Sequence, residues 1–352
     1  MSSAEHILSY AQTLRGGGVE RALLRLAGEW ITLGRRVTLV IGAPDGPLAR
    51  ELPDRAKVVP LGSPDYRALL SLPRHIRAQR PDVIFCAGSH YTGVAAWTRW
   101  RLGRQTPPIV GKVSNALVRP DHGAATGLAH ALWLRQHPRF LDRVVAMTPA
   151  SAVQTAAMMR LSPSLIPIIP NPPARPMVGA APLGLPLPPR YMLGVGRLAP
   201  QKRWDRLVTA VAAMRERVPL VILGEGEQRE SLAAQARALG VELLLPGHAA
   251  DPLPVMAGAA LVALTSDFEG TPGVLREALS VGTPVVATDS SPAVAEIIAD
   301  PAWGTMVPRE DPAALIVALD RWMVAPRPEP VTPPGNDSAA RYLALFDSLM
   351  PA

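Results

Sequence analysis

The N-terminal stretch ILSYAQTLRGGGVERALLRLAGEWITLGRRVTLVI, residues 7–41, contains the pattern that decides the fold. Residues 7–11 form a first apolar segment, and residues 37–41 form an apolar, β-branched run of the kind found in strands. Between them, three glycines precede a helical pattern whose apolar residues share one face: Val19, Ala22, Leu23, Leu26, Ala27 and Trp30. Gly34 stands where a helix commonly ends. A strand, a glycine turn, a helix and a strand form a βαβ unit, which predicts an α/β fold.

The same alternation continues along the rest of the chain. Before the proline-rich region, further strands are expected at 57–61, 83–86, 109–113 and 143–147, with helices at 66–79, 92–102 and 127–133. After it, strands are expected at 191–195, 220–223, 241–244, 260–264 and 284–287, with helices at 204–217, 228–239, 253–257, 274–281, 312–323 and 338–349. This alternation predicts two Rossmann-like, doubly wound parallel sheets that face each other across a cleft, where ligands should bind.

Proline divides the chain into domains. Ten prolines lie between residues 163 and 189, and neither a helix nor a central strand could contain so many, so the region reads as a linker. We expect four parts: an N-terminal domain (1–170), a hinge (171–189), a second domain (190–330) and a C-terminal segment with a helix (331–352).

Composition narrows the class of protein. The chain has 352 residues, of which 48% are apolar and 18% charged, as in globular proteins. Cys86 is the only cysteine, which permits no internal disulfide and fits a reducing compartment. The N-terminus lacks the pattern of a secretory signal, and no apolar stretch is long enough to cross a bilayer. We therefore expect a cytoplasmic protein.

Charge is distributed unevenly between the two halves. Residues 1–175 carry 22 Arg and Lys against 10 Asp and Glu, whereas residues 176–352 carry 14 against 19. The basic half suggests an anionic partner, although an arginine-rich composition would give the same count. Residues 67–80 and 97–104 combine arginines with apolar or aromatic residues, which suits either anionic lipid headgroups on a membrane or an ordinary solvated face. No nucleic-acid motif occurs, so nucleic acid is not an expected partner.

The most specific motif is SDFEGTPGVLREA, residues 266–278. An expected strand ends at Leu264 and a helix is expected from Val274, so the backbone N–H groups of residues 271–274 should form an anion-binding helix N-terminus. Glu269 precedes the loop and Glu277 is expected in the first turn of the helix, so both can face one ligand. The alternative is that both glutamates are solvated carboxylates at a helix cap.

Glu269 to Glu277 resembles the E-x7-E signature of the retaining glycosyltransferases of family 4, which have the two-domain GT-B fold. Other segments at matching places are Gly16-Gly17-Gly18-Val19-Glu20, Ile169-Pro170-Asn171-Pro172, Val195-Gly196-Arg197-Leu198 with Lys202, Leu223-Gly224-Glu225-Gly226, Leu245-Pro246-Gly247 and residues 340–346. The resemblance extends over nearly the whole chain and implies an acceptor-binding N-terminal domain, a nucleotide-sugar-binding second domain and a last helix that packs back on the first.

The resemblance also implies roles for single residues. Arg197 and Lys202 would bind the diphosphate of the donor, Glu277 the ribose hydroxyls, and Glu269 the transferred sugar. Many members have a histidine where this chain has Ser114, and His90 is a candidate to replace it. The implied catalytic residues are Glu269, Arg197, Lys202 and His90. The implied donor-binding residues are Gly17, Gly18, Arg197, Lys202, Gly247, Glu269, Thr271, Pro272, Gly273, Val274 and Glu277.

Together these features predict a retaining hexosyltransferase, which would take the sugar from a nucleotide sugar, expected to be a UDP-sugar. The acceptor would be a lipid-linked saccharide or glycolipid of surface polysaccharide synthesis, reached at the inner face of the cell membrane. No Asp-x-Asp motif occurs, so neither a metal nor a cofactor is expected.

Two other functions stay open. A nucleotide-sugar epimerase can share the fold but needs further acid–base residues at the sugar, and a non-catalytic binder would keep Arg197, Lys202 and Glu277. Residues 194–199 match the letters of the dinucleotide fingerprint, but Pro200 and the residues after it delay the helix, which argues against a nicotinamide site.

Overall fold

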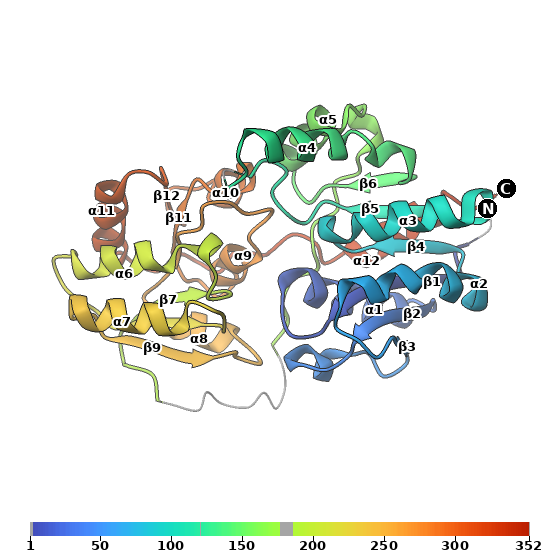
Figure 1. Ribbon diagram of the computed structural model, residues 1–352. Coiled ribbons are helices and arrows are strands. Elements are labelled where there is room, and N and C mark those ends of the chain that lie inside the picture. Colours follow the sequence, from blue (N-terminus) through green and yellow to red (C-terminus); the bar gives the residue numbers. More distant parts are fainter. Residues whose placement is uncertain (1–2, 120, 177–185, 352) are drawn as a thin grey trace. The chain divides into compact units, whose positions relative to one another are not determined.

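The computed structural model describes residues 3–119, 121–176 and 186–351. The chain divides into two compact units, unit 1 (Met1–Pro172 and Pro334–Ala352) and unit 2 (Pro173–Pro333), each with its own hydrophobic core (Figure 1). Of the predicted hinge, residues 177–185 lie outside the described residues. No helix in the described ranges is long and apolar enough to cross a membrane.

Unit 1 contains a six-stranded parallel sheet with the strand order β3-β2-β1-β4-β5-β6. The strands are β1 (His6–Thr13), β2 (Arg36–Ala43), β3 (Lys57–Pro60), β4 (Val83–Cys86), β5 (Ile109–Lys112) and β6 (Arg143–Val145). The helices are α1 (Gly18–Thr32), α2 (Leu72–Gln79), α3 (Thr92–Leu102), α4 (Ala124–Leu134), α5 (Pro149–Met159) and α12 (Ser338–Asp347). Every residue of β4 is buried, as in a strand with helices over both faces of its sheet.

Helix α12 belongs to the core of unit 1 although it follows unit 2 in the sequence. Its Tyr342 and Phe346 are fully buried, and they pack on Trp30 of α1 and Phe85 of β4 at ring-centroid distances of 5.1–6.1 Å, edge-on in three of the four pairs. Aromatic side chains bury large apolar areas and gain further from edge-to-face contact. This cluster therefore ties the C-terminal helix to the first βαβ unit.

Unit 2 repeats the design with the strand order β12-β11-β10-β7-β8-β9. The strands are β7 (Met192–Val195), β8 (Leu220–Leu223), β9 (Leu243–Gly247), β10 (Leu261–Leu264), β11 (Val285–Thr288) and β12 (Gly304–Val307). The helices are α6 (Trp204–Ala212), α7 (Arg229–Leu239), α8 (Leu253–Gly258), α9 (Gly273–Ser280), α10 (Pro292–Ile297) and α11 (Pro312–Trp322). The expected α/β fold with two parallel sheets is confirmed.

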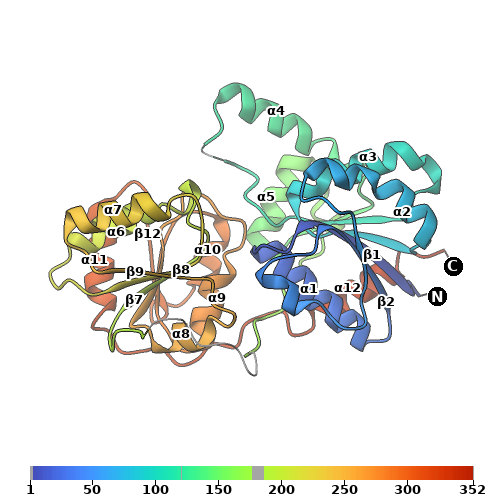
Figure 2. The ribbon, with the colours of Figure 1, turned by 60° about the horizontal axis from the view of Figure 1, so that its bottom comes forward.

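The two sheets share one topology, in which the first strand of the unit is central and the chain builds outward from it in both directions (Figures 1 and 2). The connection reverses between β1 and β4 in unit 1 and between β7 and β10 in unit 2. At such a switch point the loops that follow the two strands diverge, which leaves room for a ligand at their carboxyl ends.

The sequence patterns missed α5, α10 and β12 and misplaced several ends. The expected strand 143–147 stops at Val145, because Thr148 forms a capping box with Ser151 and so starts α5. The expected helix 204–217 ends at Ala212, where the N–H groups of the next two residues bond carbonyls three residues back and tighten the last turn.

The expected linker also begins later than its prolines suggest. The N–H of Ile169 donates to the carbonyl of Ala146 at 2.8 Å, and Ile168 pairs with Ala146 in a parallel bridge. Ile166 and Ile169 are buried. Residues 166–169 therefore extend the edge of the sheet in unit 1, since a proline at an edge strand loses no bond that the sheet needs.

Candidate active site

Two loops meet at the switch point of unit 2. One follows β7 and the other follows β10, and three hydrogen bonds join them: Asp267 N–H to the Gln201 carbonyl (2.9 Å), Gln201 Nε2 to the Phe268 carbonyl (2.7 Å) and Thr265 Oγ1 to the Lys202 carbonyl (3.2 Å). The sequence motifs around Arg197 and Glu269, which lie 72 positions apart, are thereby brought to one place.

Lys202 and Glu269 form the central pair of this site. Lys202 Nζ lies 2.6 Å from Glu269 Oε1, and their side chains are 15% and 11% exposed. Ser266 Oγ donates to the same carboxylate oxygen at 2.6 Å, and the backbone N–H of Glu269 donates to the Ser290 carbonyl at 2.8 Å. The pair thus holds one positive and one negative group in fixed, largely dry positions, where charge acts more strongly than in water.

Asp267 stabilises the same loop through contacts with three arginines. Its carboxylate accepts from Arg206 Nη2 at 2.9 Å and faces Arg203 Nη1 at 3.3 Å, and its carbonyl accepts from Arg309 Nη1 at 2.7 Å. These three arginines therefore anchor the segment that leads into Glu269. The sequence analysis did not single out Asp267, because its partners are scattered along the chain.

Glycines keep the carboxyl edge of this sheet open. Gly196, Gly224 and Gly247 follow or end three neighbouring strands, and all have positive φ angles. A Cβ on Gly224 would lie 2.0 Å from the Gly196 carbonyl oxygen, and one on Gly196 would lie 3.2 Å from Lys202 Cε. Only glycine adopts this backbone without strain, so these positions let the chain pass close to the lysine.

The loop before α9 supplies the remaining donor-binding candidates. Gly273 begins α9, with Pro272 at its N-cap and Val274 in its first turn. The hydroxyl of Thr271 is buried and has no hydrogen-bond partner among the described residues, and the same holds for Ser290 and Ser291. Buried hydroxyls are normally hydrogen-bonded, so these three hydroxyls, which lack a partner among the described residues, suit a polar ligand.

Two candidates differ from the sequence picture in detail. Glu277 is half-buried on α9 but lies in its second turn, not its first, since the helix starts at Gly273. Arg197 is exposed, and its side chain has no partner in the described part of unit 2. Its carbonyl accepts a 2.9 Å hydrogen bond from Trp204 Nε1, which holds the backbone of the loop.

At the switch point of unit 1, a glutamate again occupies the centre. Glu20 lies in the first turn of α1, where its Oε1 accepts from the Tyr91 hydroxyl at 2.9 Å and lies 3.7 Å from His90 Nε2. Burial raises the pKa of Glu20, but the nearby His90 ring, the backbone and the hydrogen bond from Tyr91 lower it by more, so the net shift of the pKa is downward. Glu20 is therefore a stable anion at this site.

Gly17 makes this position of Glu20 possible. Gly17 has a φ of +145°, and a Cβ there would lie 2.4 Å from Glu20 Oε2, whereas a Cβ on Gly18 would meet nothing within 4 Å. The close approach expected at Gly17 therefore serves the chain's own carboxylate. Neither Glu20 nor Tyr91 was assigned a role from the sequence. Only the fold brings Tyr91, in the loop after β4, next to Glu20 on α1.

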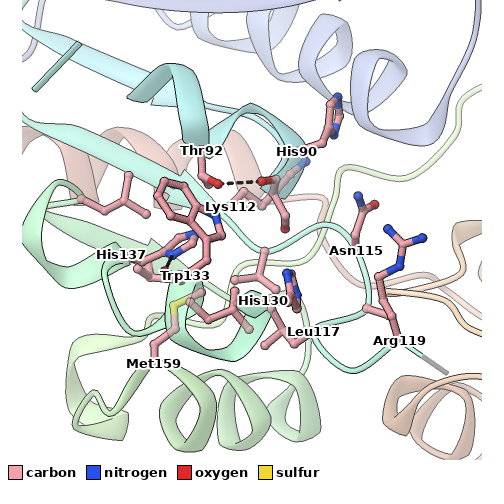
Figure 3. Close-up of a pocket in the computed structure, with 17 residues that line it drawn as sticks. His90, Thr92, Lys112, Asn115, Leu117, Arg119, His130, Trp133, His137 and Met159 are labelled. Carbon is pink, nitrogen blue, oxygen red and sulfur yellow. Dashed lines mark hydrogen bonds between the residues drawn. The ribbon is translucent and has the colours of Figure 1, made fainter. Parts of the chain in front are cut away.

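A cavity of about 110 Å³ lies nearby in unit 1, beyond β4 and β5 (Figure 3). Its lining combines basic and aromatic side chains with apolar ones and includes Lys112, Arg119, His130, Trp133 and His137. In Figure 3 the ring of His90 points away from His130, Trp133 and His137, toward α1. His90 thus touches both the cavity and the Glu20 cluster.

Lys112 is the most buried charged group of this cavity, with 2% of its surface exposed. Burial lowers its pKa to about 8, although the nearby Glu20 and Cys86 act in the opposite direction. Its Nζ donates to Asn171 Oδ1 at 2.9 Å, which joins β5 to the end of unit 1. The sequence analysis assigned no role to Lys112.

Ser114, which stands where the family histidine was expected, pairs with Ser89. Each backbone N–H donates to the other residue's hydroxyl at 3.1 Å. Since Ser89 directly precedes His90, this pair holds the loop after β4 against the loop after β5. Ser114 has no imidazole, so His90 remains the candidate to replace the family histidine.

Two family models match the chain. The model described as Glycosyltransferase Family 4 matches residues 16–172, and the model described as Glycosyl transferases group 1 matches residues 189–324. The two matches fall on unit 1 and unit 2 respectively and together cover most of the chain.

Among curated proteins, the matches cover between 14% and 41% of each relative's length. One is the N-acetylgalactosamine-N,N'-diacetylbacillosaminyl-diphospho-undecaprenol 4-alpha-N-acetylgalactosaminyltransferase of Campylobacter jejuni, 36% identical over 34% of this chain and 33% of its own length. Another is the GDP-mannose-dependent alpha-(1-6)-phosphatidylinositol monomannoside mannosyltransferase of Mycolicibacterium smegmatis, 35% identical over 39% and 41%.

Solved structures resemble the chain over nearly its full length. HepE of Anabaena, crystallised with UDP and glucose, has a TM-score of 0.72 at 19% identity and covers 98% of this chain and 97% of its own. WaaG, a glycosyltransferase involved in lipopolysaccharide biosynthesis, has a TM-score of 0.64 at 18% identity and covers 97% of each chain. At these identities the likeness establishes the GT-B fold.

Proposed function

The chain belongs to the family 4 glycosyltransferases, and from this premise we propose that it transfers a hexose from a UDP-sugar to a lipid-linked saccharide or glycolipid, with retention of anomeric configuration. The Lys202–Glu269 pair at the switch point of unit 2 is the observation that carries the proposal. A dinucleotide-type fold offers its ligand site at this edge, and the pair supplies a cation for a diphosphate beside an anion for the sugar.

Unit 2 would hold the donor. Arg197, exposed and without a partner in the described part of its unit, would contact the diphosphate together with Lys202. The bare Thr271 hydroxyl and the N-terminus of α9 would add donors to the same phosphate or to sugar hydroxyls, and Glu277 would accept from the ribose. No metal is required in this scheme, because protein cations and N–H groups would neutralise the leaving group.

In the proposed reaction, the bond between the anomeric carbon and the diphosphate oxygen breaks, and its electron pair stays on that oxygen. The acceptor hydroxyl oxygen bonds the same face of the anomeric carbon and passes its proton to the departing diphosphate. Lys202 and Arg197 would stabilise the charge that grows on the leaving oxygen. Glu269 would orient the sugar hydroxyls and stabilise the positive charge that develops at the anomeric carbon.

The cavity of unit 1 would receive the polar part of the acceptor. Lys112, Arg119 and the histidines suit a phosphate-bearing group, and Trp133 suits the apolar face of a sugar ring. The names of the Campylobacter and Mycolicibacterium relatives specify lipid-linked acceptors, which supports this assignment. The enzyme would work at the cytoplasmic face of a membrane.

The first test is a panel of UDP-, GDP- and ADP-sugars, with NAD as a control, read as thermal stabilisation and as release of nucleoside diphosphate in the presence of EDTA. We expect one UDP-sugar to stabilise the protein and to be hydrolysed slowly without acceptor. A response to NAD alone, or to none of the sugars, would contradict the proposal. Turnover that EDTA abolishes would contradict metal independence, and NMR of the product linkage would test retention.

A further inference from the structure

Helix α4 of unit 1 presents its apolar face to the solvent. Its sequence, AATGLAHALWL, contains no charged residue. Five residues at the spacing of one helical face are all exposed: Ala125, Leu128, Ala129, Leu132 and Trp133. Leu128 is 61% exposed and Leu132 48%, while Leu134 is the buried residue of the helix. Figure 2 shows α4 at the outer edge of unit 1, and it packs on α5.

This arrangement reverses that of α1 in the same unit. In α1 the residues Ala22, Leu23, Leu26 and Trp30 show the same spacing and are buried against the sheet. A helix in a water-soluble domain normally turns such a face inward, because each buried leucine gains free energy on leaving water. The exposed apolar face of α4 is therefore expected to contact an apolar partner.

Two exposed arginines lie at the C-terminal end of this face. Between residues 116 and 141 the chain has three arginines, Arg119, Arg135 and Arg139, and one acidic residue, Asp121, which pairs with Arg119 through two hydrogen bonds. Arg135 and Arg139 lie just beyond the C-terminal end of α4 and are exposed. Exposed leucine and tryptophan side chains suit the headgroup and acyl boundary of a bilayer, and exposed arginines beside them attract anionic lipids.

We propose that α4 docks unit 1 onto an anionic lipid bilayer, with Leu128 and Leu132 in the headgroup and acyl boundary and with Arg135 and Arg139 against lipid phosphates. The charge decides between a bilayer and a second copy of the chain. A second copy would have to offer a carboxylate to Arg135 and Arg139, and Asp121, the acidic residue between positions 116 and 141, already pairs with Arg119.

The docking face is distinct from the cavity next to it. Leu128 and Leu132 do not line the cavity, whereas His130 and Trp133 of the same helix do. Substitutions at the two leucines therefore test docking without touching the candidate acceptor site. If the proposed function holds as well, a lipid-linked acceptor in the bilayer would reach the cavity alongside α4.

The test is cosedimentation of the full chain with vesicles of phosphatidylcholine containing about a third phosphatidylglycerol, compared with pure phosphatidylcholine. We expect the wild type to bind the anionic vesicles, more weakly at high salt, and L128E/L132E to bind at least about tenfold more weakly. The matched control is V317E, since Val317 is 69% exposed on α11 of unit 2, and it should bind as the wild type does.

Three results would overturn the proposal. One is binding of L128E/L132E equal to that of the wild type. Another is loss of binding on W100E instead, since Trp100 of α3 is 71% exposed and lies near Arg101, which would move the surface to residues 97–104. The third is a wild-type dimer in sedimentation velocity without lipid that L128E/L132E makes monomeric, with vesicle binding unchanged, because a second copy would then be the partner.

Release of nucleoside diphosphate without lipid separates this inference from the proposed function. L128E/L132E should hydrolyse the donor at the wild-type rate, because neither leucine lies in the candidate site. A donor-inactive wild type that still binds vesicles would contradict the transferase proposal and leave the docking helix standing.

Discussion

Both units place a glutamate at the switch point of the sheet, but from different strands: Glu20 follows β1, whereas Glu269 follows β10, the counterpart of β4. In unit 1, Glu20 accepts from the Tyr91 hydroxyl and has no lysine or arginine nitrogen within ion-pair distance among the described residues. In unit 2, Glu269 pairs with Lys202 at 2.6 Å. One strand order thus provides a hydrogen-bonded cluster in one unit and a charge pair in the other. The topology locates the site, and the side chains decide its chemistry.

The largest expected effect tests whether the unit 2 glutamate is the reactive one. Glu269→Ala should lower glycosyl transfer about a thousandfold, since it removes a charge placed for the transition state. Circular dichroism should show an intact fold. The control is Glu310→Ala, at an exposed glutamate of the same unit. If the Glu269 variant kept more than about a tenth of the activity, Glu269 would not be a catalytic residue, and a non-catalytic binding site would be favoured.

The second comparison sets the buried Lys112 of unit 1 against the partly buried Lys202 of unit 2. Lys202→Met should reduce donor turnover about a hundredfold or more, because the leaving diphosphate loses a cation. Lys112→Met should leave hydrolysis of the donor without acceptor nearly unchanged, since Lys112 belongs to unit 1. Steady-state kinetics of donor hydrolysis measures both variants. Equal losses of donor turnover would contradict the assignment of the donor site to unit 2.

The third prediction concerns stability and pH at Lys112. Burial lowers its pKa to about 8 from an ordinary value near 10.5, so the unfolded chain binds more protons between these values. Stability from this group is therefore complete above the unfolded pKa and is lost as the pH falls through about 8. We expect the free energy of unfolding of wild type relative to Lys112→Met to rise by about 2 kcal/mol between pH 8 and pH 10. A flat difference in denaturant titrations would show that the ammonium is not desolvated.

The fourth prediction concerns acid stability at Glu20. Its folded pKa is lowered, so it stabilises the protein above the unfolded pKa, near 4.5, and this stability is lost as the pH falls through the folded value. Glu20→Gln should cost about 1 kcal/mol at pH 7, and the difference from wild type should vanish in acid. Urea titrations at both pH values measure it. A difference that persists in acid would assign the cost to packing, not to charge.

The smallest expected effect is that of His90→Ala. The ring is 38% exposed and 3.7 Å from Glu20, and exposed pairs contribute at most about 1 kcal/mol, or about fivefold in rate. Transfer to an acceptor should fall by no more than about that factor, with donor hydrolysis unchanged. A much larger loss, with the pH profile of transfer altered, would make His90 a catalytic residue equal in rank to Glu269.

Strand and helix alternation was readable from the sequence because it depends on local periodicity. Elements such as β4 and β8 match their expected ranges, since buried parallel strands are apolar throughout. The element α5 was missed because its start depends on a capping box, and β12 because only two of its four residues are buried. The helix of α4 was expected, but the outward direction of its apolar face was not, since periodicity identifies an apolar face but not its direction.

Of the candidate site, the sequence by itself determined the residue types and their loops: the glycines, Arg197, Lys202, Glu269 and the start of α9. Only the tertiary structure decided which of them meet. Lys202 and Glu269 are 67 positions apart, so no local sequence pattern can pair them. They meet because β7 and β10 are parallel neighbours in the sheet. Glu20 and Tyr91 meet for the same reason across β1 and β4. Contacts of this kind depend on sheet order, which long-range packing of the core selects, whereas strands and turns follow from neighbouring residues.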